Sequence, residues 1–423
     1  MHRLTGRIGL SIRPYVTTLM MLLLAPGAGV VAAGAADAPA SDRSLAVQAA
    51  VLASATAAEA GGTQEAGGQE ATGEAEAPAA DAAQTADGAG DFFRQIEVSG
   101  LVDGYYAWAF HEESPGLRSF DINHNQFSLS YAELAVGKPV SDTSRAGFRL
   151  DFGAGDTADV VNSFEPGDPD FMKHVQQAYV SYLIPAGKGL TFDFGKFVTP
   201  AGGEVIETSG NYNYSRGILF GWAIPFYHMG ARLAYPVTDT VTLTGFLLNG
   251  WNNVHDNNDD KTVGVSVGVA ATDKLSVTQN YLVGKEQDED DNGGVRHLFD
   301  TVVSYAATEQ VSVLGNFDYA RDEVGGADVD WYGVAASLRY QMDDNWAFAP
   351  RYEIFKDSDG FATGLAQTAQ SFTLTAEYKV SGLITRYEFR TDFSDEPFFT
   401  NGDQLEESQS AVIFGVIYTF SSK

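Results

Sequence analysis

The sequence predicts an all-β protein: a transmembrane antiparallel up-and-down β-barrel of about 16 strands, preceded by a signal peptide and a disordered acidic linker. Three observations predict this fold. Apolar and polar residues alternate with period two in one segment after another from residue 92 onward. Short and long connections alternate between these segments, and tyrosines recur at one end of them. The 45 glycines, 19 tyrosines and 27 phenylalanines also favour strands and tight turns.

Residues 1–36 have the features of a secretory signal peptide. Arg3, Arg7 and Arg13 precede the apolar run YVTTLMMLLLA, which is followed by the small residues VVAAGAA. The alternative is a short transmembrane anchor, but the apolar run is shorter than a membrane span requires. The mature chain is expected to begin near Ala36 or Asp37.

Residues 37–91 are predicted to be a disordered linker. Stretches such as EAGGTQEAGGQEATGEAEAPAA contain Ala, Glu, Gly, Gln and Thr but no aromatic residue, so they bury too little apolar surface to offset the entropy of folding. The Ala-rich stretch Ser41–Ala60 has helix potential, and composition alone leaves its state open.

The remainder, residues 92–423, is predicted to be the barrel. In Thr385–Phe393 (TRYEFRTDF), charged residues occupy the even positions, whereas Tyr387, Phe389 and Phe393 lie on the opposite face. Applied along the chain, the same test gives sixteen segments: 97–110, 126–136, 145–153, 175–184, 189–197, 226–235, 241–251, 261–270, 275–285, 297–305, 311–320, 331–340, 346–356, 370–379, 382–392 and 408–420.

The connections and tyrosines predict an orientation. Short turns such as 139–143, 185–189 and 342–345 alternate with long loops such as 198–225 and 393–407. Strands that lead into short turns mostly end on an outward tyrosine, as an interfacial aromatic girdle requires: Tyr182, Tyr235, Tyr305, Tyr340, Tyr378 and Tyr418. Short turns are therefore expected to be periplasmic and long loops extracellular. A soluble β-sandwich is the disfavoured alternative, because it rarely keeps one such register over so many strands.

Composition excludes several classes of protein. A net charge of −30 argues against nucleic-acid binding, which needs clustered Lys and Arg. The absence of cysteine excludes disulfides and thiolate metal sites. Loop 286–296 has the start of a calcium loop in Asp288, Asp290, Asn292 and Gly293, but Phe299 stands where the bidentate Glu belongs. No metal and no cofactor are expected, and an acidic solvated loop is favoured there.

Several stretches resemble a known family. FDFGKFVTPAGGEVIET (192–208), NYSR (213–216), PFYHMGARLAY (225–235) and LNGWNN (248–253) resemble the OmpL-like β-barrel porins of Gram-negative outer membranes. The resemblance covers residue 92 to the C-terminus and implies an integral outer-membrane barrel among lipids. Resemblance to sixteen-stranded general porins implies a possible homotrimer.

The last strand resembles the outer-membrane assembly signal. Gly415, Tyr418 and Phe420 match that pattern, which implies recognition by the barrel-assembly machinery. This chain departs from it in Ile413 and in the three residues after Phe420.

If the apolar faces meet lipid, the other faces line a pore. A sixteen-stranded barrel leaves a water channel, so its lining is expected to screen permeant ions rather than to pack. Loop 198–225 is the candidate constriction, with Glu204 and Glu207 expected to face Arg145, Arg149 or Arg232. The alternatives are a loop packed on the extracellular rim and charges that satisfy each other across strands. The full set of candidate pore-lining and constriction residues is Arg145, Arg149, Asp151, Glu204, Glu207, Arg232, Arg351, Glu353, Arg386, Glu388 and Arg390.

The favoured function is passive diffusion of small hydrophilic solutes and ions. The acidic loops predict a mild preference for cations, whereas the arginines of the lumen predict the reverse, and cations are favoured. One alternative is an outer-membrane anchor or adhesin that is tethered through the linker. The other is a barrel hydrolase, but none of the 7 histidines has a partner at catalytic spacing, so no catalytic residue and no enzyme are expected. His228, beside a strand end, is instead expected to hydrogen-bond within the barrel wall or a loop.

Overall fold

The computed structural model describes residues 90–423 except 91, 112–113, 164, 166–171 and 289–292. The predicted signal peptide, almost all of the predicted linker and most of the acidic tip of loop 286–296 therefore lie outside the described residues. Within the described part, no helix is long and apolar enough to cross a membrane.

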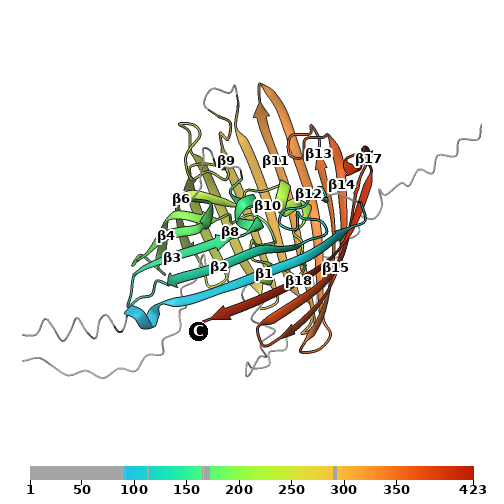
Figure 1. The fold of residues 1–423 in the computed structure, drawn as a ribbon. Helices are drawn as coiled ribbons and strands as arrows, with labels where there is room; N and C mark the ends of the chain where they lie inside the picture. Colours follow the sequence, from blue (N-terminus) through green and yellow to red (C-terminus); the bar gives the residue numbers. More distant parts are fainter. Residues whose placement is uncertain (1–89, 91, 112–113, 164, 166–171, 289–292) are drawn as a thin grey trace, which may run out of the picture. The chain divides into compact units, whose positions relative to one another are not determined.

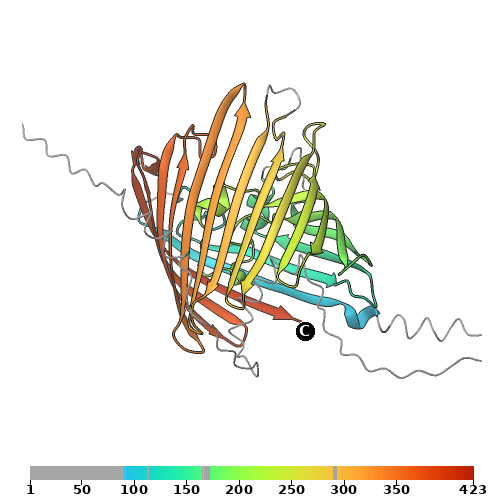
Figure 2. The same cartoon turned by 180° about the vertical axis from the view of Figure 1, so that it is seen from behind.

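Sixteen strands in the described part of the chain form one closed antiparallel barrel, which confirms the predicted fold (Figures 1 and 2). Each strand pairs with its sequence neighbour, and the last strand pairs with β1 to close the ring. The two remaining strands, β16 and β17, form a separate hairpin in the predicted loop 393–407. The bounds are β1 Glu97–Ala109, β2 Phe127–Lys138, β3 Ala146–Ala154, β4 Val175–Ile184, β5 Leu190–Val198, β6 Tyr227–Pro236, β7 Val241–Leu248, β8 Thr262–Thr272, β9 Leu275–Gly284, β10 Arg296–Ala306, β11 Val311–Val324, β12 Ala327–Gln341, β13 Trp346–Asp357, β14 Gln367–Val380, β15 Leu383–Ser394, β16 Phe399–Asn401, β17 Gln404–Glu406 and β18 Ser408–Ser421.

The alternation of side chains is the predicted one. In β15, Tyr387, Phe389 and Phe393 are exposed on the outer face, whereas Arg386 and Arg390 are buried inside. Four of the predicted girdle tyrosines, Tyr182, Tyr305, Tyr340 and Tyr418, are exposed, and the other two are half-buried. The outer wall is therefore apolar and aromatic, as a lipid-facing wall must be.

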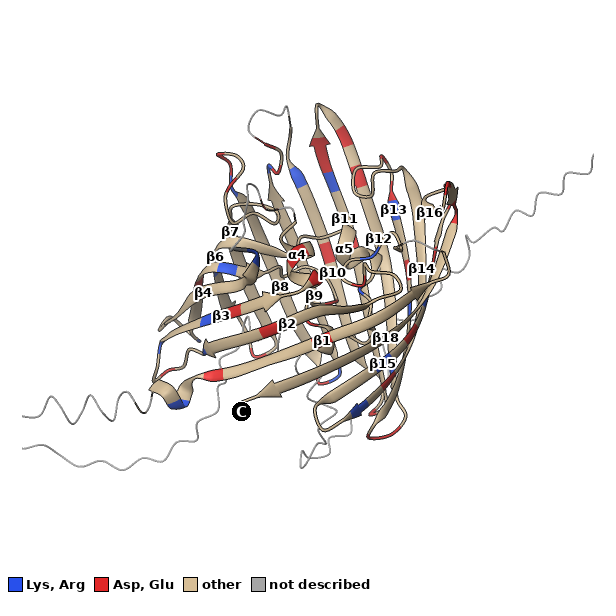
Figure 3. Cartoon of the chain, in the orientation of Figure 1, with Lys and Arg blue, Asp and Glu red and all other residues tan. Residues whose placement is uncertain are grey.

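Strands β11 and β12 are longer than the predicted 311–320 and 331–340. They continue past those bounds and meet in a tight turn at Gly325 and Gly326, whose φ angles are 60° and 82°. Only glycine adopts such angles without strain, so a two-residue hairpin closes where a longer loop was expected. Acidic residues gather at this projecting end (Figure 3).

Much of the apolar core lies inside the barrel. It joins lumen-facing side chains such as Phe246 and Phe355 to loop side chains such as Phe120, Leu219 and Phe220. The short helices in these loops are α4 (Asp156–Val161), η1 (Met172–His174), η2 (Thr208–Gly210) and α5 (Ile218–Trp222). Long loops thus fold inward and pack within the lumen.

Placing a charge on the outer wall is expected to destabilise the barrel. Leu374 lies at the middle of β14 and is 44% exposed on the outer face. Leu374→Arg should lower the free energy of unfolding in lipid vesicles by about 2–4 kcal/mol, because an arginine at the bilayer midplane loses its hydration. The matched control is Thr278→Arg on the lumen face of β9, and equal losses for the two variants would contradict the assignment of the outer face to lipid.

Candidate functional site

The segment between β5 and β6, residues 199–226, crosses the inside of the barrel. Asn211, Asn213, Ser215, Arg216 and Ile218 are all buried. Because backbone groups inside a lumen need partners in place of water, the wall must supply them. The structure therefore contradicts the alternative in which this loop rests on the extracellular rim.

Three buried arginines of the wall donate to backbone carbonyls of this segment. Arg386 on β15 donates to the carbonyls of Thr208, Asn211 and Asn213 at 2.5–2.8 Å. Each arginine is held in turn by a carboxylate on its own or a neighbouring strand, as in the pair of Arg386 with Glu377 at 2.8 Å. The other two donors are Arg351, which reaches the Ser215 carbonyl at 2.7 Å, and Arg390, which reaches the Arg216 carbonyl at 2.6 Å.

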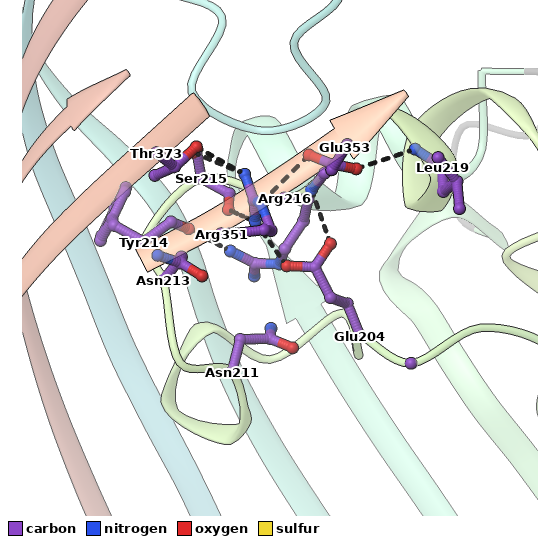
Figure 4. Close-up of polar contacts among 12 residues, drawn as sticks. Glu204, Asn211, Asn213, Tyr214, Ser215, Arg216, Leu219, Arg351, Glu353 and Thr373 are labelled. Carbon is purple, nitrogen blue, oxygen red and sulfur yellow. Dashed lines mark hydrogen bonds and ion pairs between the residues drawn. The ribbon is translucent and has the colours of Figure 1, made fainter. Parts of the chain in front are cut away.

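Carboxylates of the same wall accept from the loop's N–H groups. Glu388 accepts from the backbone N–H of Tyr214 at 2.6 Å and of Ser215 at 3.0 Å. Glu353 accepts from Leu219 at 3.3 Å (Figure 4). Alternating arginine and glutamate along β13 and β15 thus match the alternating carbonyl and N–H groups of one loop, and each charged contact is stronger than a neutral one.

The loop also binds β1 and β18. The Tyr214 hydroxyl donates to Asp103 on β1 at 2.7 Å, and the Thr208 hydroxyl donates to the same carboxylate. Gly415 on β18 leaves room for the Tyr214 ring, since a Cβ at that position would lie 2.2 Å from it. Gly415, noted above as part of the assembly signal, is therefore also required by the packing of this loop.

Several candidate residues are placed differently from the expectation. Glu204 pairs with Arg351 at 2.7 Å rather than with Arg145, Arg149 or Arg232. Arg232 pairs with Asp193 on the neighbouring strand at 2.7 Å. Arg145 directly precedes β3 at its short-turn end, beyond the reach of these loop contacts.

The expectation that the lining screens ions rather than packs is wrong for the charged side chains of β13 and β15. The side chains of Arg351, Arg386 and Arg390 are at most 1% exposed, because the loop covers them. Glu353 and Glu388 are buried with them. Their charges fasten the loop instead of facing water.

The opposite wall is more open. The side chain of Arg149 on β3 is 38% exposed and pairs with Asp151 at 2.5 Å. Glu207, at the start of η2, is half-buried and has Asp151 and Arg149 as electrostatic neighbours. Its removal from water, together with the Asp151 carboxylate, raises the pKa of Glu207 above its usual range.

A second inward loop was missed from the sequence. Arg118, in loop 111–125, is buried against Asp121 at 2.7 Å and Asp392 at 3.5 Å, and the neighbouring Leu117 carbonyl accepts from Arg390. Asp103 and Arg216 were also absent from the predicted set. Asp103 left a signal, since it is the one charge in the interior of β1, whose other charge is Glu97 at the first position, whereas the loop residues left none.

Among the described residues, no group of three or more His, Cys, Asp or Glu side chains could hold a metal ion. His228 is buried, with Nδ1 2.8 Å from the Gly250 carbonyl and Nε2 3.2 Å from the Thr199 hydroxyl. This confirms the expectation that it hydrogen-bonds within the wall and loops.

A barrel whose inward loop is fixed to the lumen wall is the arrangement of porins. A family model described as "Putative beta-barrel porin-2, OmpL-like" matches residues 95–420. The chain belongs to this family. It is therefore a porin-type β-barrel of the outer membrane.

Solved porins share the fold at low sequence identity. An anion-selective porin from Comamonas acidovorans is 13% identical with a TM-score of 0.56, and the match covers 77% of this porin and 99% of that chain. The outer-membrane channel DcaP of Acinetobacter baumannii is 13% identical with a TM-score of 0.52, over 77% and 97%. OmpF of Salmonella typhi, in complex with daunomycin, is 15% identical with a TM-score of 0.52, over 77% and 97%. No match was found among curated proteins.

Proposed function

We propose that this porin lets small hydrophilic solutes and ions diffuse passively across the outer membrane, and that segment 199–226 narrows its channel. The observation that carries the proposal is the loop held inside the lumen by Arg351, Arg386 and Arg390. A loop fixed in this way sets the width of a channel without any chemistry, so no cofactor is needed. Family and fold favour a non-enzymatic channel over the barrel hydrolase.

The path for solutes lies between the loop and strands β2–β5. On that side, part of the surface stays exposed on Arg149, Gln177, Tyr179 and Thr191. The lumen-facing charged side chains of β13 and β15 are instead covered by the loop. Arg149 on β3 and Glu207 on the loop act on each other electrostatically and would border this path. They would set a transverse field at the narrowest point.

Carboxylates outnumber bases beside the path. Glu207, Glu133 and Asp151 influence one another electrostatically, and Arg149 and Arg216 are the bases that act on Glu207. Fixed negative charge at a constriction lowers the barrier for cations and raises it for anions. We therefore expect a preference for cations.

This preference should depend on pH. Because the pKa of Glu207 is raised, its charge is present only at pH values above that raised pKa and disappears as the pH falls through it. On acidification, the reversal potential under a KCl gradient should therefore approach zero, the value for a non-selective channel. This change should occur at a higher pH than an ordinary glutamate would give. Glu207→Gln should flatten this part of the profile, and a pH dependence identical to that of the unsubstituted protein would refute the assignment.

The orientation and assembly are proposed by extension. Short turns would be periplasmic and long loops extracellular, residues 1–36 would be removed on export, and residues 37–91 would be a disordered tether. The barrel would be inserted among outer-membrane lipids by the assembly machinery. Homotrimer formation is proposed because one solved relative in fold, OmpT of Vibrio cholerae, is known in a trimer form with a TM-score of 0.52.

The deciding experiment is single-channel recording of the refolded mature protein in a planar bilayer. Stable conductance steps with a cation-leaning reversal potential are expected. Absence of steps from barrels that show the usual heat-dependent mobility shift would mean a closed lumen. Because much of the lumen is filled by an apolar core, that result would favour the membrane anchor instead.

A further inference from the structure

A pair of buried aspartates lies under the start of the inward loop. Asp300 on β10 and Asp318 on β11 are direct cross-strand partners, and both are fully buried. Besides Asp300, the carboxylate of Glu353 on β13 also acts on Asp318, and the arginine of that strand, Arg351, is itself paired with Glu353 at 3.1 Å. Two buried carboxylates that face each other, and that form no ion pair with a base of the described residues, cannot both carry a charge at low cost.

The hydrogen bonds around the pair are unequal. Asp300 accepts from the Asn280 amide at 2.7 Å on one oxygen and from the Asn316 amide at 2.8 Å on the other. Both oxygens of Asp318 are buried and accept no hydrogen bond in the structure, and their polar neighbours are the Asp300 carboxylate and the Asn316 amide that donates to it. Asp300 therefore has the surroundings of an ionised carboxylate, and Asp318 has those of a neutral acid that donates to it.

The same asparagines hold the loop. Asn280 donates to the Pro200 carbonyl at 2.8 Å, and the Asn316 side-chain oxygen accepts from the Gly203 N–H at 3.0 Å. The acid pair thus connects through one amide on each side to the segment Pro200–Gly203. This attachment is next to the Arg351–Glu204 pair and separate from the contacts of wall arginines with loop carbonyls, which begin at Thr208.

We propose that Asp318 holds a proton shared with Asp300, and that this proton fastens the start of the loop to strands β9–β11. Loss of the proton at alkaline pH places a second negative charge in a buried site, turns Asp318 from a donor into a repelling acceptor, and loosens Pro200–Gly203. An unfolded aspartate would already have lost this proton, so the latch is intact at low pH and lost as the pH rises. The inference rests on the proposed channel for its electrical readout only.

The test compares two variants whose expected effects differ. Single-channel recordings of the unsubstituted protein should show open-channel noise that rises about tenfold per pH unit on the alkaline side, following the ionised fraction. Asp318→Asn should remove this rise, because an amide donates to Asp300 at every pH. Asp300→Asn should show high open-channel noise at every pH, because it removes the carboxylate that accepts from the Asn280 and Asn316 amides. The control, Asp344→Asn in the exposed turn 342–345, should behave like the unsubstituted protein.

Several outcomes would overturn the proposal. If Asp318→Asn and Asp300→Asn show the same open-channel noise at every pH, the two aspartates support the structure without sharing a proton. Suppression of the alkaline noise by calcium chloride at constant pH and ionic strength would show a metal ion in place of the proton. If the variants do not refold, or if no conductance is found, amide hydrogen exchange of the unsubstituted barrel still decides the matter. As the pH rises, the protection factor of the Gly203 amide must then fall relative to those of the Tyr214 and Ser215 amides. If the three protection factors change with pH in the same way, the latch is rejected.

Discussion

Arg386→Ala is expected to detach the inward loop from the wall and to enlarge the channel. Arg386 supplies the donors for the carbonyls of Thr208, Asn211 and Asn213, and it neutralises Glu377. Its removal leaves three buried carbonyls without these donors, while Glu377 keeps Arg339 as a partner at 2.8 Å, and the loss is expected to cost about 3–5 kcal/mol in total. The single-channel conductance should increase, and the free energy of unfolding in detergent and urea should fall by an amount in this range.

The control for Arg386 is another arginine pair of the same barrel. Arg321 pairs with Asp328 at the projecting end of β11 and β12, where both side chains are more than half exposed. Because exposed ion pairs contribute little, Arg321→Ala should lower the free energy of unfolding far less than Arg386→Ala and leave the conductance unchanged. If Arg386→Ala also leaves the conductance unchanged, the loop does not limit the channel, and the proposed constriction is wrong.

Glu207→Lys is expected to reverse the ion selectivity. The substitution changes the charge beside Arg149 by two units, and each unit alters the energy of a passing ion by on the order of 1 kcal/mol at an effective dielectric between those of water and protein. The ratio of cation to anion permeability should therefore fall by about tenfold or more, so that anions are preferred. The reversal potential under a KCl gradient measures this directly.

A matched charge change away from the lumen separates this local effect from the field of the whole protein. Glu309 lies exposed in the short turn between β10 and β11, so Glu309→Lys makes the same change of two units at the barrel's edge. It should shift the reversal potential only slightly, and less at high salt, where surface charges are screened. Equal shifts for the two variants would place the selectivity outside the proposed constriction.

The candidate site was predictable in part. The length and position of segment 198–225 indicated a constriction loop, and the charged faces of β13 and β15 could be read from their alternation. Which charges would meet could not be predicted. Glu204 was expected to face Arg145, Arg149 or Arg232 across the channel, but it lies against the wall at β13, where it pairs with Arg351. A linear pattern gives the face of each strand but not the direction in which a loop crosses the interior.

Sequence alone determined the barrel, its number of strands and which residues of each strand face lipid and which face the lumen. With a period of two, a shift of one residue would turn every apolar side chain to the wrong face, so only one assignment is possible. The tertiary structure decided what the lumen charges do. Arg386, Arg390 and Glu388 read as pore lining until loop carbonyls and N–H groups from about 175 residues away were found on them. Such contacts depend on how the closed barrel and its inward loops share one interior, and no local pattern encodes that arrangement.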